Sequence, residues 1–194
     1  MPIRWEMPPV YLQSGDPEKE NVRTLHAPGQ LGSRFTIKQP TGAGTPGAVT
    51  STTGDAYLYK RYQIVRSDSA MTASPGLGDV AWWSDKPNYV VTNVYAAGRR
   101  GQVAGVFQNN QLTYPITPGY YCCVQIGGRA MTRFTDGDAP DASGLFVIPG
   151  AADGRSSILT AGTAATYPVL GRTASGPIGG QSLCYVDLDV PETV

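Results

Sequence analysis

Glycine and proline recur along the whole chain, and they limit its possible folds more than any other feature. The sequence has 24 glycines and 16 prolines among 194 residues, about a fifth of the chain where average usage gives about an eighth. Proline lacks an amide hydrogen, and glycine loses the most backbone entropy on folding, so both interrupt helices. We therefore expect an all-β protein with under about a tenth of its residues in helix.

Stretches rich in tyrosine, valine and isoleucine alternate with turn sequences from residue 56 onward. The expected strands are Ala56–Val65, Asp79–Trp83, Asn88–Tyr95, Gly101–Phe107, Gln111–Ile116, Gly119–Gly128, Arg129–Phe134, Gly144–Pro149, Thr166–Ala174 and Ser182–Val190. Turn signals separate them at intervals of about 8–14 residues, which is typical of a small β-sandwich or barrel of short strands. The one helix candidate, Ser156–Ala165, is weakened by Gly162.

Residues 1–55 differ in composition, with prolines every few residues and one strand pattern, at Ser33–Gln39. Apolar residues recur between the prolines, as in an extended chain that lies on another surface. We expect residues 1–55 to form a long extended N-terminal arm and linker, and residues 56–194 to form the β domain. The candidate partner-binding residues of the arm are Trp5, Tyr11, Leu12, Leu25 and Phe35.

The sequence offers little support for catalysis or for a cofactor. The single histidine, His26, has no second histidine or Cys-x-x-Cys motif with which to bind zinc or build a triad. The glycine string Gly42–Gly47 contains Pro46 and is not followed by a helix pattern, so it does not predict a nucleotide site. We expect no enzyme activity, no catalytic residues, no cofactor and no metal site.

Two local features leave alternatives open. The loop Asp136–Asp141 carries three carboxylates, which could bind calcium but do not follow the EF-hand pattern, and a solvated turn is the simpler interpretation. The cysteines Cys122, Cys123 and Cys184 are odd in number, and two are adjacent. Neighbouring residues of a strand point to opposite faces, so we expect buried free thiols rather than a disulfide framework.

Charge and hydropathy exclude two classes of partner. Lysine and arginine total 15, as do aspartate and glutamate, so the chain lacks the basic excess that nucleic-acid binding requires. No run of 18 apolar residues predicts a membrane span. The first 15 residues mix prolines and charges, unlike a signal peptide, so we expect synthesis in the host cytoplasm without export.

Four segments together resemble the head decoration, or cement, proteins of tailed bacteriophages. They are Arg100–Thr113, Thr117–Ala130, Val169–Ala174 and Val186–Val190. The shared pattern is a Gly-x-x-Ala-Gly-Val strand, a Tyr-x-x-Val-Gln strand, a Gly-Gly turn, a Leu-Gly segment and a closing acidic–apolar strand. The resemblance covers about residues 78–190 and leaves the arm outside.

This resemblance implies a structural virion protein without enzyme activity. Such a protein binds the major capsid protein on the outside of an assembled capsid, usually as a trimer, and stabilises the shell by bridging neighbouring capsomers. The main alternative is a carbohydrate-binding or adhesin module of a phage tail or cell surface. Its binding platform would be Trp82 and Trp83 with Tyr89 and Tyr95, beside the Asp136–Asp141 loop. A hydrolase with a carboxylate pair is a third possibility.

Overall fold

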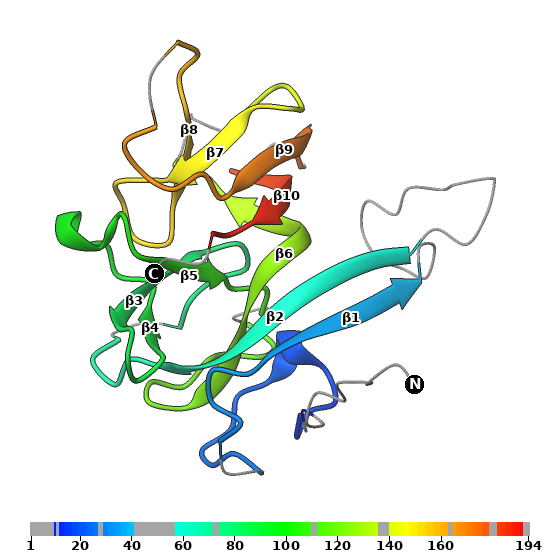
Figure 1. Ribbon diagram of the computed structural model, residues 1–194, viewed down its shortest axis with the longest axis vertical. Coiled ribbons are helices and arrows are strands. Elements are labelled where there is room, and N and C mark those ends of the chain that lie inside the picture. The colour runs from blue at the N-terminus through cyan, green and yellow to red at the C-terminus, as the bar shows by residue number, and fades with distance from the viewer. Residues whose placement is uncertain are drawn as a thin grey trace, which may run out of the picture.

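The computed structural model describes residues 10, 12–26, 29–40, 57–71, 74–109, 112–135, 140–162, 165–178 and 182–191. Of these residues, 43% lie in strands and 4% in helices, which confirms the all-β prediction. Both described helices are three-residue 3-10 turns, η1 (Pro17–Lys19) and η2 (Ala97–Arg99). Figure 1 shows the strands gathered around a small barrel, with further strands above it.

The described strands form one continuous sheet in the order β1-β2-β4-β3-β5-β6-β10-β9-β7-β8. Their bounds are β1 (Arg34–Pro40), β2 (Tyr57–Ser67), β3 (Val80–Asp85), β4 (Val90–Thr92), β5 (Val103–Val106), β6 (Tyr121–Arg133), β7 (Phe146–Pro149), β8 (Ser156–Ile158), β9 (Gly171–Pro177) and β10 (Leu183–Asp189). A further pairing of β2 with β6 closes β2, β4, β3, β5 and β6 into a five-stranded barrel.

Every second side chain of the barrel strands points inward, and these side chains fill the barrel interior. Cys122, Val124 and Ile126 of β6 point inward and pack with residues such as Val65 and Trp83. Because successive side chains of a strand face opposite sides, the residues between them point out of the barrel. Cys123 accordingly belongs to a different apolar cluster on the outer face.

The longest strand, β6, belongs to two parts of the sheet. Its first half pairs with β2, and its second half, from Gly127 to Arg133, pairs with β10. The prediction of a turn at Gly127-Gly128 is therefore wrong, because β6 runs through these residues with an irregularity in its pairing to β2. Gly128 has a φ of 79°, in the left-handed region that glycine adopts without strain. The glycine pair thus lets β6 bend from one partner to the next.

Three further expectations need correction. The helix candidate Ser156–Ala165 begins instead with strand β8, which pairs with β7. The expected strand Gln111–Ile116 is a loop over its described residues, 112–116. Its Pro115 cannot donate to a ladder, and the Asn109 side chain donates to the carbonyl of Tyr114 instead. The Asn88–Tyr95 strand shortens to β4, since residues 86–89 form a turn.

Beyond the barrel, β10, β9, β7 and β8 extend the sheet and cover a second core. This cluster includes Trp82 of β3, Phe134, Leu170 and Val186. It lies outside the barrel, since Trp82 points away from the interior that its neighbour Trp83 faces. The core inside the barrel and this second core therefore share the strands β3, β5 and β6.

Candidate functional site

The N-terminal segment, residues 12–26 of the described chain, lies against the outer face of the barrel below β1 and β2 (Figure 1). On that face Tyr62, Ile64 and Cys123 are buried. Val10, Leu12, Leu25, Phe35 and Ile37 pack against them and are themselves partly buried. The rings of Phe35 and Tyr62 stack with centroids 5.9 Å apart. The segment therefore covers apolar surface that the barrel would otherwise expose to water.

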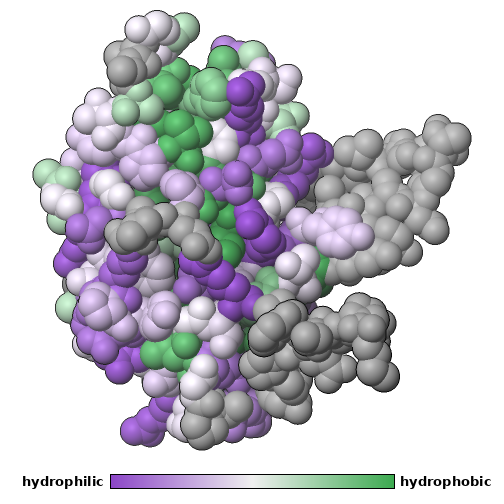
Figure 2. Space-filling model, viewed as in Figure 1, coloured by the Kyte–Doolittle hydropathy of each residue, from purple (hydrophilic) through white to green (hydrophobic). Residues whose placement is uncertain are grey.

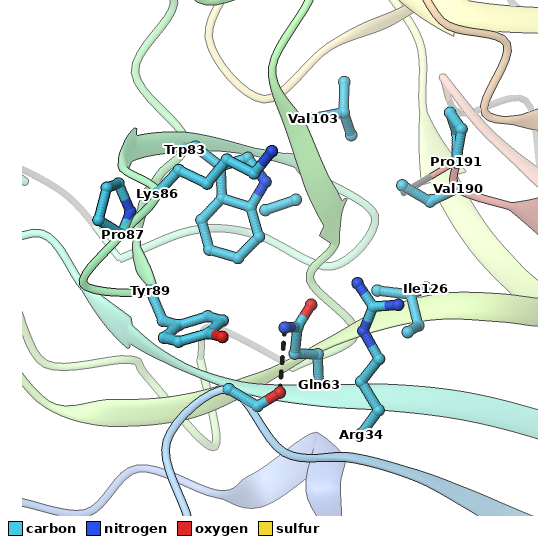
Figure 3. A pocket seen from close by; sticks show the side chains of 12 residues that line it. Arg34, Gln63, Trp83, Lys86, Pro87, Tyr89, Val103, Ile126, Val190 and Pro191 are labelled. Carbon is cyan, nitrogen blue, oxygen red and sulfur yellow. Dashed lines mark hydrogen bonds between the residues drawn. The ribbon is translucent and has the colours of Figure 1, made fainter. Parts of the chain in front are cut away.

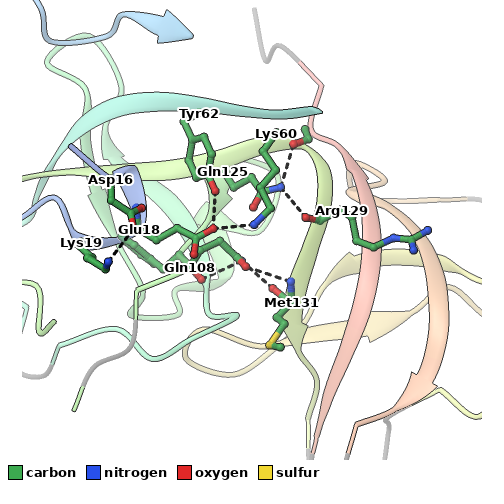
Figure 4. Close-up of polar contacts among 11 residues, drawn as sticks. Asp16, Glu18, Lys19, Lys60, Tyr62, Gln108, Gln125, Arg129 and Met131 are labelled. Carbon is green, nitrogen blue, oxygen red and sulfur yellow. Dashed lines mark hydrogen bonds and ion pairs between the residues drawn. The ribbon is translucent and has the colours of Figure 1, made fainter. Parts of the chain in front are cut away.

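A small polar network fixes the segment beside this apolar contact (Figure 4). Lys60 Nζ lies 2.8 Å from Glu18 Oε1, and the Tyr62 hydroxyl donates to the same oxygen at 2.7 Å. Burial raises the pKa of Tyr62, and the charge of Glu18 raises it further. The hydroxyl therefore keeps its proton and remains a donor to the carboxylate.

The helical turn η1 places Glu18 at this position. Asp16 caps the turn by accepting a hydrogen bond from the amide of Glu18, and Pro17 opens it with a φ suited to a helix start. Lys19 forms an exposed ion pair with Asp16, and the hydrogen bond and charge of Asp16 raise the pKa of Lys19. The local sequence Asp-Pro-Glu-Lys thus points the Glu18 carboxylate at the barrel.

Two other contacts hold the same segment. The Asn21 side chain donates to Thr117 Oγ1 at 3.1 Å and accepts from the Thr117 amide at 2.9 Å. Val22 and Tyr121 exchange backbone hydrogen bonds at 2.8 and 2.9 Å. Glu20, almost fully buried, accepts from the amides of Gln13 and Ser14. The bonds of Asn21 and Val22 attach the segment to the rest of the folded domain, and those of Glu20 stabilise the segment internally.

The structure places three of the five candidate partner-binding residues. Leu12, Leu25 and Phe35 contact their own barrel, each leaving part of its surface exposed. Trp5 and Tyr11 lie outside the described residues. Contact with another protein remains a prediction for all five residues.

The anchoring residues Glu18, Lys60, Asn21 and Thr117 were not predicted from the sequence. Their partners are 42 and 96 residues away along the chain, and no local pattern connects them. The domain boundary expected at residues 55 and 56 falls outside the described residues. The strand β1, which lies N-terminal to this boundary in the sequence, pairs with β2 over seven residues.

The two tryptophans do not form an exposed platform. Trp82 is 0% and Trp83 5% exposed. Trp82 contacts Tyr95 edge to face with centroids 6.2 Å apart, and Trp83 contacts Tyr89 in the same way at 6.1 Å. Both indoles serve as core residues, as aromatic side chains in β proteins commonly do.

The structure confirms that the three cysteines are free and buried, with Cys122 and Cys123 on opposite faces of β6. Burial raises the pKa of the Cys122 thiol to about 12, that of Cys184 to about 11, and that of Cys123 well above its usual value. Since the thiolate is the reactive form, these thiols are inert in the folded protein at neutral pH.

Asp79 is a buried carboxylate at the start of β3. It accepts hydrogen bonds from the Gly76 amide at 2.7 Å and from Asn93 Nδ2 at 3.2 Å, and Arg133 Nη1 lies 3.5 Å away. Burial raises its pKa, and these partners oppose the shift. The contacts give Asp79 a role in joining the loop before β3 to the end of β6.

The proposed calcium loop is only partly described, since residues 136–139 lie outside the described chain and Asp141 is exposed. Among the described residues no group of three or more His, Cys, Asp or Glu side chains could hold a metal ion. The described helices are too short to cross a membrane. Comparison with known protein families and with curated proteins found no match.

Proposed function

We propose that this chain is a structural virion protein without enzyme activity. It would bind the outer surface of an assembled phage capsid and bridge neighbouring capsomers, as the resemblance to cement proteins implies. The observation that carries the proposal is the placement of the resembling segments. Two of them lie between residues 100 and 130 and two between residues 169 and 190, yet all four fall on β5, β6, β10 and β9, which are consecutive in the sheet.

The pairings within this unit support reading the segments as one structural motif. Val106, which ends the Ala-Gly-Val strand, pairs with Gln125 of the Val-Gln strand. Val186 of the closing strand pairs with Ala130 on one side and with Thr173 on the other. The order β5-β6-β10-β9 places the four segments side by side in one part of the sheet, although the Gly-Gly pair is a bend within β6 and not the turn of the resembling pattern.

The surface of the protein also favours binding to another protein. Charged residues make up 15% of the chain, and several large apolar side chains are exposed, including Leu112 at 89% and Tyr59 at 57%. Figure 2 shows a mainly polar face with apolar side chains along a strip in its upper half. Leu145 and Phe146 of the β7 region are among the exposed residues. Exposed aromatic and aliphatic side chains are the usual contributors to protein interfaces.

The described N-terminal segment, residues 12–26, is anchored to the barrel. Glu18, Asn21 and Val22 bind the barrel, so the described segment is attached to its own domain at these residues. An extended segment of about ten residues spans about 33 Å. In a trimer, three such arms would reach neighbouring capsid subunits.

Binding to capsids tests the proposal directly. Capsids of a tailed phage that encodes this chain, assembled without it, would be mixed with the protein and examined by negative-stain microscopy and co-sedimentation. We expect regular decoration of the shell. Removal of residues 1–9 should weaken decoration, as should Trp5→Ala, whereas Trp5→Phe should retain most of it. Full decoration by the truncated chain would show that residues 1–9 are not needed for binding. No decoration by the full chain would contradict the proposal.

The adhesin alternative has lost its main support, because both tryptophans are buried in the cores of the chain itself. Binding of the chain to polysaccharides in a glycan screen, together with failure to bind capsids, would restore it.

A further inference from the structure

One end of the barrel opens into a pocket of about 460 Å³, the barrel-end pocket. Its described lining comes from the loop before β1, from the barrel strands, from the turn between β3 and β4, and from the residues that follow β10. Ligand pockets typically have volumes of about 300–1,000 Å³. The space is therefore large enough for an aromatic group of two fused rings.

The pocket has an aromatic side and an aliphatic side. Figure 3 shows Trp83 and Tyr89 on one side of the space, and Ile126 and Val190 on the other. The rings of Trp83 and Tyr89 lie edge to face with centroids 6.1 Å apart. A flat apolar group between the two sides would contact aromatic rings on one face and aliphatic side chains on the other. This arrangement favours an aromatic ligand.

Tyr89 occupies the aromatic side at a conformational cost. Its φ is 52°, and it is the one described residue other than glycine with a positive φ. A side chain at Gly32 would collide with its ring, so the absence of a Cβ there makes room for the tyrosine. Bulky residues in this backbone region are strained, and such strain is found preferentially at ligand sites.

The side-chain oxygen of Gln63 faces the space between the two sides. Gln63 is 3% exposed, and its amide nitrogen donates to the Gly32 carbonyl at 3.2 Å. Because a carbonyl can only accept, the nitrogen must face Gly32, and the amide oxygen points into the pocket, as Figure 3 shows. Among the residues that the structure describes, none donates to this oxygen. Gln63 therefore offers a hydrogen-bond acceptor to a ligand.

The sheet holds this acceptor in place. Gln63 pairs with Arg34 of β1 on one side and with Val124 of β6 on the other. The Gly32 amide donates to the carbonyl of Ile64 at 2.9 Å, which fixes the residue whose carbonyl binds the Gln63 side chain. A polar group held by rigid neighbours needs little reordering when a ligand binds.

The ligand should carry no net charge. The Gln63 oxygen bears a negative partial charge and opposes an anion, while any ion would lose hydration beside Ile126 and Val190. Arg34 and Lys86 also line the pocket, but each already has an interaction partner. The site therefore favours a neutral hydrogen-bond donor.

From this arrangement we propose that the barrel-end pocket binds an indole ring. The ring would lie between the aromatic and aliphatic sides, and its N–H would donate to the side-chain oxygen of Gln63. An indole has one donor and no acceptor, so this single hydrogen bond satisfies it. A free indole and the tryptophan side chain of a peptide carry the same chemistry. The inference does not depend on capsid binding.

Matched probes with and without the N–H test the site. Indole and benzothiophene represent the free ring, and acetyl-tryptophanamide and acetyl-benzothienylalaninamide represent the peptide. Each sulfur analogue has nearly the shape of its indole partner but cannot donate a hydrogen bond. Each probe would be titrated into the full chain to about 1 mM, where a site of useful affinity becomes occupied. Nitrogen–proton NMR spectra would follow the Gly32 backbone amide and the Gln63 side-chain amide.

We expect at least one indole probe to shift the Gly32 and Gln63 signals and to bind about twofold to tenfold more tightly than its sulfur analogue, as for one hydrogen bond. In Gln63→Met, which removes the acceptor, this preference should disappear. Should that variant fail to fold, the preference of the original protein still decides. Tyr89→Ala should weaken binding of both members of a pair. Tyr114→Ala is its control, because Tyr114 is similarly exposed but does not line the pocket.

The two pairs of probes also distinguish the sources of the ring. Tighter binding of acetyl-tryptophanamide than of indole would identify a peptide as the ligand, and the reverse would identify a free indole. No shift with either indole probe would overturn the proposal. So would a sulfur analogue that binds as tightly as its indole partner, or a preference for indole that persists in Gln63→Met.

Discussion

Glu18 and Lys60 are 42 residues apart in sequence, yet their carboxylate oxygen and ammonium nitrogen lie 2.8 Å apart. The Lys60 side chain is 11% exposed and that of Glu18 35%. The ion pair is therefore shielded from water on the lysine side. Composition alone would assign the segment that holds Glu18 to an arm. The ion pair joins this segment to the barrel.

Replacement of Glu18 by alanine should lower the free energy of unfolding by about 1–2 kcal/mol, between the values for exposed and buried ion pairs. The reason is that Lys60 and the Tyr62 hydroxyl would both lose their acceptor at a largely buried site. Urea unfolding measures the change. Lys19→Gln removes an exposed ion pair with Asp16 and should change little. Equal effects of the two substitutions would contradict the role of Glu18.

Gly128→Ala should destabilise the protein by about 2 kcal/mol or more, because φ is positive there and a Cβ would collide with the Tyr59 carbonyl. Gly101→Ala provides the control, since nothing lies within 4 Å of a Cβ at that position. Its effect should stay within about 0.5 kcal/mol. Thermal or urea unfolding of both variants decides the matter, and a tolerated alanine at 128 would mean that β6 does not need its glycine bend.

The three cysteines should resist alkylation in the folded protein and react once it is unfolded. Burial excludes the reagent, and the raised thiol pKa values remove the reactive thiolate. Intact-mass measurement without reductant should show no labels before unfolding and three labels after it. Fewer than three labels in the unfolded state would reveal a disulfide.

The buried Asp79 should make stability depend on pH. Burial raises its pKa in the folded state, so the folded protein binds the proton more tightly than the unfolded chain, whose aspartate pKa is about 3.9. The resulting stabilisation is complete below that value and is lost as pH rises through the folded pKa.

The matched comparison is Asp79→Asn, which cannot titrate. The free energy of unfolding of the original protein, minus that of Asp79→Asn, should fall as pH rises above about 4. Urea unfolding at a series of pH values would measure this difference. A difference that stays constant or rises with pH would show that the partners of Asp79 outweigh its burial.

Features that depend on neighbouring residues could be predicted from the sequence. The strands β5, β7 and β10 lie within expected strands, and β2 and β3 overlap theirs and extend two residues further, because alternation of side chains is a local signal. The opposite placement of Cys122 and Cys123 follows from the same alternation. The weak helix candidate Ser156–Ala165 begins with a strand instead, because pairing of Ser156–Ile158 with β7 outweighs any local helix preference.

Features that depend on distant partners could not be predicted. A glycine pair signals either a turn or a bend, and only the pairing of β10 beside β6 decides between them at Gly128. The anchoring of Glu18 by Lys60 and Tyr62 requires β2 to lie beside η1. Likewise, the hydrogen bonds between Asn21 and Thr117 join residues that are 96 positions apart, and no local pattern connects them.

The central claim is that this protein stabilises an assembled capsid. A protein that binds the shell but not its separated subunits shifts the equilibrium toward the shell, and binding sites repeated over the lattice strengthen the effect. The most direct measurement is the temperature at which capsids rupture, by calorimetry, with and without saturating protein. We predict a higher rupture temperature for decorated capsids, retained at high salt because apolar contacts are not screened. The same rupture temperature with and without the folded protein would contradict the account.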